Sequence, residues 1–393
     1  MEHHEAVIVG AGPAGLAAAA LLRKRGFETL VLERTAAVGA SWRARYDGLR
    51  LNTMRALSTL PGYRVPRRYG RYPRREDFIA YLEAYASHHR LALRLQTTLQ
   101  RVERTEDGGR WRLQTSSGPL LARYAVIATG YDAVPKLPGW ASDGRFTGEL
   151  IHAADYRSPS PYRGREVLIV GAGNTGVDIA GFLIDAGAHV SLAMRTPPNL
   201  FPRDWHGIPL QPIAIPAEYL PAKIGDALGF ALQRLIHGDL SPHGMPRAPD
   251  GFQTKFRREL ISPAVDDGFI AALKAGQTRI VAAVSDIEGR DVVLADGTRL
   301  QPDVVICATG YARGLEPIAG HLGVLRADGL PIRYGGAPEH PDAPRLYFAG
   351  FHGPPGGQIR IAPIHARRIA RAAARDRERS RLSRPAAAAA PAA

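Results

Sequence analysis

The sequence predicts an α/β protein with two Rossmann-like dinucleotide-binding domains, the second inserted into the first. Two observations predict this class. A strand, a glycine-rich loop and a helix follow one another twice in the same order, and each copy closes with the same Ala-Thr-Gly-Tyr turn, at residues 128–131 and 308–311. A repeat of this length indicates two units of one architecture. The 393 residues are enough for two domains with cores of their own.

The elements of the first copy follow from its apolar periodicity. The β-branched run "AVIVG" and the run "YAVIATGYD" are typical of buried strands, and the alanine-rich stretch between the first two strands is typical of a helix. We expect strands at residues 6–10, 27–34, 93–105, 110–117 and 124–132, and helices at 11–26 and 75–89.

The same pattern restarts at residue 166. We expect strand, loop, helix and strand over residues 166–195, a meander over 279–300, a strand at 303–311, and a strand, glycine-rich turn and long helix over 345–374. That last piece is expected to return to the first domain.

The domain boundaries follow from this repeat. We expect the first domain over residues 1–160, the second over 161–312 with a helical excursion at 197–265, and the return to the first domain over 313–380. The alanine- and proline-rich residues 381–393 have low complexity and are expected to be disordered.

Composition excludes several classes of protein. No apolar run approaches the roughly 18 residues that a membrane-spanning helix needs, and the N-terminus enters a strand directly, which leaves no room for a secretory signal. Cys307 is the single cysteine, so an internal disulfide, a CxxC redox pair and a cysteine-rich metal site are ruled out, and we expect no metal. A cytoplasmic enzyme is the simplest interpretation.

The net charge of +14 does not by itself indicate nucleic acid. Only five of the 51 basic residues are lysines, a bias that a GC-rich genome explains, and no nucleic-acid motif frames the scattered arginines. We expect no nucleic-acid partner and a positive field that attracts anionic dinucleotides. A homodimer stays open.

The first glycine loop has the spacing G-x-G-x-x-G between a strand and a helix. Its glycines allow a tight turn, close approach of a pyrophosphate and close packing of the helix on the strand. Glu33 ends the second strand, where a carboxylate accepts hydrogen bonds from the ribose hydroxyls of FAD or NAD. The expected cofactor contacts of this loop are Gly10, Gly12, Pro13, Ala14, Gly15, Glu33 and Arg34.

The second glycine loop repeats the spacing but carries a basic residue where the first copy has Glu33. A guanidinium there binds a 2′-phosphate, which a carboxylate would repel, so this loop is expected to take NADP(H). An ordinary solvated arginine is the alternative for Arg195. The expected contacts are Gly171, Gly173, Asn174, Thr175, Gly176, Arg195 and Thr196.

A short polar segment stands between the loops. Phe146, Gly148, His152 and Tyr156 fit the pattern F-x-G-x-x-x-H-x-x-x-(Y/F) about 15 residues before the second loop. With this pattern in this place, the chain resembles the class B flavoprotein monooxygenases, which include the flavin-containing and Baeyer–Villiger enzymes. Tyr156-Arg157 looks more like the N- and S-oxidising branch.

The resemblance covers nearly the whole chain. "VGASWR" looks like the family's G-x-x-W-R segment, so the resemblance implies cofactor contacts at Trp42 and Arg43, and the strand after it carries Asn52. The closest resemblance is to the YUCCA-type branch and its bacterial relatives, which decarboxylate a 2-oxo acid oxidatively. Asn52 departs from that branch, because this residue is more typical of amine and sulfide oxidisers.

The resemblance implies FAD and NADPH as cofactors, and O₂ and a small organic molecule as substrates. NADPH would reduce the flavin, which activates O₂ as a C4a-(hydro)peroxyflavin and transfers one oxygen atom in N- or S-oxidation or in oxidative decarboxylation. The alternatives are an NADPH-dependent flavin oxidoreductase or oxidase without oxygen transfer, and a redox sensor without catalysis.

Asn52 is the expected catalytic residue, as a side chain that holds NADP⁺ or the peroxide by hydrogen bonds; a turn-capping asparagine is its alternative. The turn from Gly350 to Gln358 is expected to place a helix N-terminus near the flavin. His152 is expected to bond across the domain interface, with a packed structural histidine as the alternative. Further cofactor contacts are expected at Thr129, Gly130, Thr309, Gly310 and Tyr311 of the two repeated turns.

Overall fold

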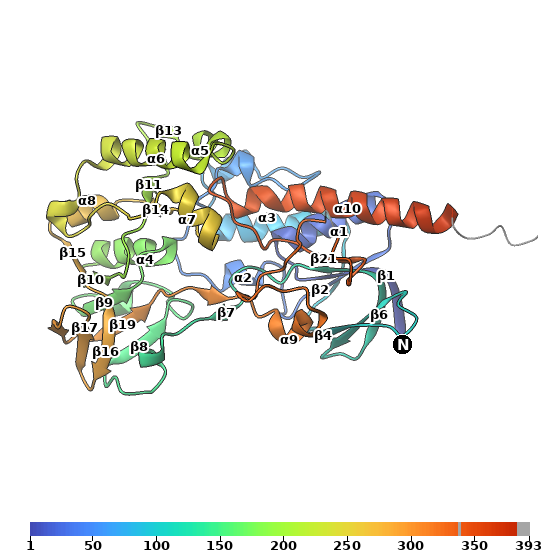
Figure 1. Ribbon diagram of the computed structural model, residues 1–393, viewed down its shortest axis with the longest axis horizontal. Helices are drawn as coiled ribbons and strands as arrows, with labels where there is room; N and C mark the ends of the chain where they lie inside the picture. The colour runs from blue at the N-terminus through green and yellow to red at the C-terminus, as the bar shows by residue number, and fades with distance from the viewer. Residues whose placement is uncertain (337–338, 383–393) are drawn as a thin grey trace, which may run out of the picture.

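The computed structural model describes residues 1–336 and 339–382. Two sheets, each with its own helices, lie side by side along the longest axis of the molecule (Figure 1). Of the tail predicted to be disordered, residues 383–393 lie outside the described residues. Residues 381 and 382 belong to the last helix, α10 (Gln358–Leu382), so the predicted boundary at residue 381 cuts into a helix.

The first sheet has the strand order β3-β2-β1-β6-β5-β4. Its central strand β6 is shared, because its first half pairs antiparallel with β5 and its second half pairs parallel with β21. The chain therefore returns to this sheet after the second unit. The strands are β1 (Glu2–Val9), β2 (Thr29–Leu32), β3 (Ala92–Arg94), β4 (Leu99–Arg104), β5 (Trp111–Thr115), β6 (Leu120–Ile127) and β21 (Leu346–Phe348).

The single strand predicted at residues 93–105 was wrong. The chain turns at Gln96, whose φ is +52°, and this divides the segment into β3 and β4. Strand β3 runs parallel to β2, whereas β4 runs antiparallel to β5. The backbone N–H groups of Gln96 and Thr97 bond to the carbonyls of Thr35 and Glu33, which holds the turn against the end of β2.

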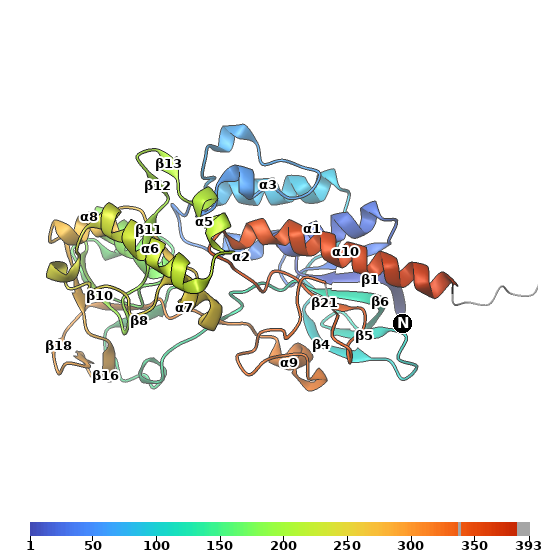
Figure 2. The ribbon, with the colours of Figure 1, turned by 45° about the horizontal axis from the view of Figure 1, so that its top comes forward.

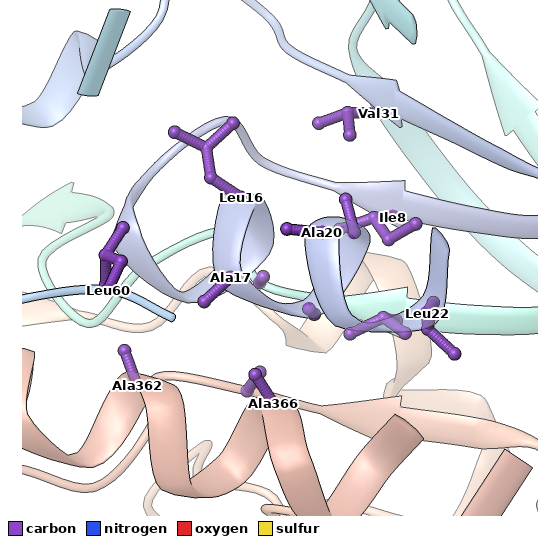
Figure 3. Packing of buried hydrophobic residues seen from close by; sticks show 14 of the residues in the cluster. Ile8, Leu16, Ala17, Ala20, Leu22, Val31, Leu60, Ala362 and Ala366 are labelled. Atoms are coloured by element: carbon purple, nitrogen blue, oxygen red, sulfur yellow. The ribbon is translucent and has the colours of Figure 1, made fainter. Parts of the chain in front are cut away.

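Helices α1 (Pro13–Lys24), α3 (Arg75–His88) and α10 cover one face of this sheet (Figure 2). Alanines at the contact, such as Ala17, Ala362 and Ala366, let α1 and α10 approach closely, and Ile8 of β1 packs on the side of α1 away from α10 (Figure 3). These four side chains are at most 3% exposed. The short helix α9 (Glu316–Ala319) packs on the opposite face.

The second sheet is entirely parallel, in the order β15-β10-β9-β19-β8. Its strands are β8 (Glu149–His152), β9 (Glu166–Val170), β10 (His189–Ala193), β15 (Thr278–Val281) and β19 (Val304–Cys307). Helices α4 (Asn174–Asp185) and α8 (Phe269–Lys274) cover one face, and a meander of β16 (Val284–Glu288), β17 (Asp291–Leu294) and β18 (Arg299–Leu300) covers the other. Because β8 belongs to this sheet, the second unit begins before the predicted residue 161.

The excursion predicted over residues 197–265 mixes helices with short strands: β11 (Leu200–Pro202), β12 (Asp204–Trp205), β13 (Ile208–Pro209), α5 (Gln211–Ala217), α6 (Ala222–His237), α7 (Phe252–Glu259) and β14 (Ala264–Asp266). Its helices α5 and α6 lie at the outer edge of the molecule (Figure 1). Gln211 connects it to the first unit, since its side chain accepts from the N–H of Met54 and donates to the carbonyl of Gly356, both at 2.6 Å.

Short elements link the units. Helix α2 (Ala40–Arg43) follows β2, and β7 (Val134–Pro135) pairs antiparallel with β20 (Tyr311–Ala312). In the described part of the chain, no helix is both long and apolar enough to cross a membrane.

Candidate functional site

The first glycine loop is tight at two positions and open at a third. Gly10 has φ +109°, and a Cβ there would overlap the carbonyl of Ala128, just as a Cβ at Gly15 would overlap the carbonyl of Gly10. A Cβ at Gly12 would meet nothing within 4 Å. Pro13 begins α1 directly afterwards, so the open space lies at a helix N-terminus, which suits a pyrophosphate.

Glu33 lies beside this loop, as predicted from its position after β2. It is buried, and its two carboxylate oxygens accept from the N–H of Ala11 at 2.9 Å and from the N–H and hydroxyl of Thr35 at 3.0 and 3.1 Å. Oε2 accepts only one of these bonds and keeps a further lone pair, so the fixed carboxylate can still accept a ribose hydroxyl. Arg34 is exposed.

The turn after β6 adds an unsatisfied polar atom to the same place. The hydroxyl of Thr129 is buried and has no hydrogen-bond partner among the described residues, and Gly130 follows with φ +97°. Gly10 approaches this turn, since a Cβ on it would lie 3.3 Å from the Cα of Thr129. A buried hydroxyl without a partner fits a site that a polar ligand completes.

The second glycine loop has the same geometry. Gly171 has φ +112° and abuts the carbonyl of Ala308, Gly176 abuts the carbonyl of Gly171, and Gly173 is open on the side where a Cβ would stand. Asn174 and Thr175 begin α4 at this loop. The matching turn after β19 differs, because the hydroxyl of Thr309 donates to the carbonyl of Lys136. Gly310, with φ +83°, follows it.

Arg195 and Thr196 follow β10 within three residues, and both are exposed. In the part of the chain that the structure describes, neither side chain makes a hydrogen bond or an ion pair. Glu33, at the matching position of the first unit, is by contrast buried and hydrogen-bonded. A free guanidinium at the end of this strand fits a phosphate group.

Asn52 lies where the two units meet. Its Nδ2 donates to Oδ1 of Asn174 at 3.1 Å, and its Oδ1 accepts from Arg203 at 2.9 Å. The catalytic residue predicted in the first unit therefore touches the first residue of the second glycine helix. No sequence pattern indicated this contact, which joins residues 122 positions apart.

Two further residues strengthen the junction, and sequence reasoning missed both. The hydroxyl of Tyr46 donates to Asp178 at 3.0 Å, and Asp178 stands one helical turn after Asn174 on α4. Tyr46 and Asn52 thus bond to successive turns of one helix face. The signal was present in "GNTGVD", because Asn174 and Asp178 are four residues apart and therefore share a helix face.

Burial raises the pKa values of two carboxyl groups at this junction. Burial raises the pKa of Asp178 to about 6, while Arg203 and the Tyr46 hydroxyl act in the opposite direction. Burial also raises the pKa of Asp267, which forms an ion pair with Arg203. One buried cation therefore faces two carboxylates.

A pH-dependent stability follows for Asp178. Its folded pKa lies above the unfolded value, so its favourable contribution is complete below about pH 4 and is lost as the pH rises through 6. We expect Asp178→Asn, which keeps the acceptor for Tyr46, to stabilise the protein by about 1–3 kcal/mol near pH 8. Urea unfolding at several pH values tests this, and a stability difference that does not shrink between pH 8 and 5 would contradict it.

A cavity of about 450 Å³ adjoins the junction. Both units line it, and its polar wall includes Arg50, Tyr72, Arg203 and Asp267. The volume lies within the usual range for small-molecule sites. Arg50 makes no hydrogen bond or ion pair with the described residues, although its charge acts on Asp267 and two further aspartates line the same space.

The turn from Gly350 to Gln358 lies against the first glycine helix. A Cβ on Gly350, whose φ is +84°, would stand 3.0 Å from the Cβ of Ala14. Gln358 opens α10 and donates to the carbonyl of Gly350 at 2.7 Å. At the other side of the turn Gly357 abuts Thr53, the neighbour of Asn52. The N-terminus of α10 thus stands beside both the first loop and Asn52.

The bonds of His152 do not cross between the units, so the expectation of a direct bond across the interface was wrong. Its Nδ1 accepts from the N–H of Ala154 at 3.0 Å, which leaves Nε2 to donate to the carbonyl of Gly310 at 3.1 Å. Both partners belong to the second unit, because β8 pairs with β19. Tyr311, whose ring lies edge-on to His152, makes the crossing instead through its hydroxyl and Arg45, 3.0 Å apart.

The other residues of this segment pack. Phe146 lies against Gly148, and Tyr156 is 1% exposed among Tyr46 and Tyr162. Burial lowers the pKa of His152, which agrees with a packed neutral ring. The segment therefore builds the second unit's edge.

Trp42 packs against the first core, whereas Arg43 is exposed. The Trp42 ring packs edge-on to Phe78 with centroids 4.8 Å apart, and Arg43 donates to the carbonyl of Val38 and pairs with Glu83. These contacts hold α2 on α3, and a cofactor role for the pair stays a prediction. Among the described residues no cluster of histidine, cysteine, aspartate and glutamate could hold a metal ion.

Comparison with known proteins places this geometry in a family. The family model described as pyridine nucleotide-disulphide oxidoreductase matches residues 7–213. Indole-3-pyruvate monooxygenase YUCCA1 of Oryza sativa subsp. japonica is 35% identical over 309 residues, 78% of this chain and 76% of the relative. The chain belongs to the YUCCA-type flavin monooxygenases. The predicted resemblance is thereby confirmed, and the protein is a flavin-dependent monooxygenase that transfers oxygen.

A second YUCCA relative agrees, and two solved structures share the fold. Probable indole-3-pyruvate monooxygenase YUCCA3 of Arabidopsis thaliana is 32% identical, covering 83% of this chain and 77% of the relative. The fold matches the flavin-containing monooxygenase from Stenotrophomonas maltophilia with a TM-score of 0.71 at 24% identity, over 97% and 99% of the two chains. It also matches bacillithiol disulfide reductase from Staphylococcus aureus, with a TM-score of 0.66 at 18% identity, over 94% and 98%. The fold alone therefore does not decide between oxygen transfer and reduction, whereas the YUCCA relatives do.

Proposed function

We propose that this monooxygenase binds FAD at the first glycine loop and NADPH at the second, and that its substrate is a small 2-oxo acid. The observation that carries the cofactor assignment is the pair of matching loops with opposite charges at the following strand end, Glu33 in one and Arg195 in the other. A structural neighbour described as OTEMO was solved with FAD and NADP, at a TM-score of 0.70 and 16% identity over 96% of this chain and 86% of that one.

Each loop would hold its dinucleotide in the same way. The open side of Gly12 and the N-terminus of α1 accept a pyrophosphate, and Glu33 accepts the ribose hydroxyls. Gly173 and α4 do the same in the second unit, with Arg195 at the 2′-phosphate. When bound, reduced flavin supplies the electrons that activate O₂.

Residues of the protein itself would position the bound cofactors and the activated oxygen for the reaction. The N-terminus of α10, beside Ala14 and Asn52, carries the positive end of a helix dipole and would favour an anionic reduced ring. Asn52 would hold NADP⁺ and the activated oxygen by hydrogen bonds. Helix α5 would cover the region around Asn52 and the N-terminus of α10, because its Gln211 bonds to Met54 and Gly356. This cover would help to exclude water from the reaction.

The substrate proposal rests on the relatives and on the cavity. The relatives are named for indole-3-pyruvate, a 2-oxo acid, and the unpaired Arg50 on the cavity wall suits a carboxylate. N- or S-oxidation is the second candidate, since Asn52 is typical of that branch. We also propose a cytoplasmic enzyme without a nucleic-acid partner. A homodimer would cover the exposed Ile224, Leu228 and Leu235 of α6.

Isotope incorporation tests this function. With NADPH, heavy-isotope O₂ and indole-3-pyruvate, we expect loss of CO₂ and one labelled oxygen in the resulting carboxylic acid, the second oxygen atom leaving as water. The methyl ester of the same compound, which lacks the carboxylate, is the matched control and should react poorly. No carboxylic acid in the presence of catalase, with one peroxide per NADPH in its absence, would instead identify an oxidase, and labelled oxides formed from added amines or sulfides would favour the second candidate.

A further inference from the structure

Arg203 is a buried cation shared between the units. It lies between β11 and β12, and its side chain is 9% exposed. It pairs with Asp267 of the second unit and donates to Asn52 of the first, while its Nε is buried without a partner among the described residues. A buried guanidinium is stable only when it is paired, so these two contacts determine where it stands.

The direction of each hydrogen bond then fixes the orientation of Asn52. An arginine only donates, so the amide oxygen of Asn52 has to face Arg203 and the amide nitrogen has to face Asn174. The Asn174 oxygen also accepts from the N–H of Val265 at 2.9 Å, and its nitrogen donates to the carbonyl of Pro263 at 3.3 Å. Asn52 and Asn174 therefore each have a single amide orientation that satisfies all of their hydrogen-bond partners.

We infer that Arg203 is a positioning residue for oxygen transfer, which acts by holding the Asn52 amide in the orientation that reaches the second glycine loop. This inference rests on the proposed function. Arg203 also lines the 450 Å³ cavity, so one side chain connects that space to Asn52. Without Arg203 the Asn52 amide keeps only its bond to Asn174, so its oxygen end is no longer held and NADP⁺ loses a rigid neighbour. More turnovers should then end as NADPH + H⁺ + O₂ → NADP⁺ + H₂O₂, without oxygen transfer.

A double-mutant cycle on the FAD-loaded enzyme tests this role. Calorimetry gives the Kd of NADP⁺ for the wild type, Arg203→Ala, Asn52→Ala and the double variant, and a peroxidase assay gives the peroxide formed per NADPH. We expect each single variant to weaken NADP⁺ binding about 10-fold, and the double variant to bind no more weakly than Asn52→Ala. Peroxide release should follow the same pattern.

Arg203→Lys is the conservative variant and replaces Arg203→Ala in the cycle if the latter does not fold. A lysine cannot hold Asn52 and Asp267 at once with a planar fork, so an intermediate loss is expected. Arg377→Ala is the matched control, since it removes a partly buried arginine paired with Glu5 far from both loops. It should lower thermal stability without changing the Kd of NADP⁺.

The outcomes separate the inference from the function it rests on. Additive losses in the double variant, or a wild-type Kd in both Arg203 variants while Asn52→Ala binds weakly, would overturn the positioning role alone. If Asn52→Ala changes neither the Kd nor the peroxide yield, the role of Asn52 is wrong and the inference falls with it.

Discussion

Gly12→Val should yield a folded protein without bound flavin. A Cβ at this position would meet nothing within 4 Å in the protein itself, so we expect the fold to accept it. The two methyl groups would occupy the space over the α1 N-terminus that the FAD pyrophosphate requires. We expect flavin content to fall at least about 10-fold, because loss of this contact removes more than 1.4 kcal/mol of binding. The ratio of flavin to protein absorbance after purification measures this.

Two other glycines supply matched controls. Gly173→Val makes the same change in the second loop, so it should retain flavin and lose reduction by NADPH. Gly15→Ala should fail to fold, because its Cβ would overlap the carbonyl of Gly10. A Gly12→Val protein with a full flavin spectrum would show that the first loop is not the FAD site, and a colourless Gly173→Val would reverse the two assignments.

Both glycine loops were predictable because their chemistry is local. A tight turn, an open glycine and a helix N-terminus need only six consecutive positions, so the spacing from Gly10 to Gly15 already determines the shape. Glu33 and Arg195 were found for the same reason, since each follows a strand at a fixed distance from its loop. The structure places all of these residues where the spacing put them, while their ligands stay a proposal.

The rest of the site could not be predicted because it depends on contacts between distant segments. Arg203 meets Asn52 across 151 positions, and no periodicity records such a pairing. The expectation for His152 failed because strand order is not local either. Once β8 pairs with β19, the ring is enclosed in the second unit and its bonds stay there. The division of residues 93–105 has the same origin, since β3 and β4 have different partners in one sheet.

Arg195→Ala should convert a strong preference for NADPH into near-indifference between NADPH and NADH. The guanidinium is exposed at the end of β10 and has no partner among the described side chains, so no other contact has to be broken when it binds a 2′-phosphate. A charge-assisted contact contributes about 1.5–3 kcal/mol, which corresponds to a rise in KM for NADPH of roughly 10- to 150-fold. The KM for NADH, which lacks that phosphate, should change less than about twofold.

The positive electrostatic field of this basic protein requires a separate control. Removing any arginine lowers the net charge of +14 by one and weakens the long-range attraction of every dinucleotide. Arg234→Ala, on the exposed side of α6, makes that change away from the second loop and should leave the ratio of the two KM values unaltered. Steady-state flavin reduction at two salt concentrations distinguishes the effects, because the field is screened by salt whereas a direct phosphate contact is screened much less. If Arg195→Ala raises both KM values equally, Arg195 belongs to the general surface charge and the 2′-phosphate binds elsewhere.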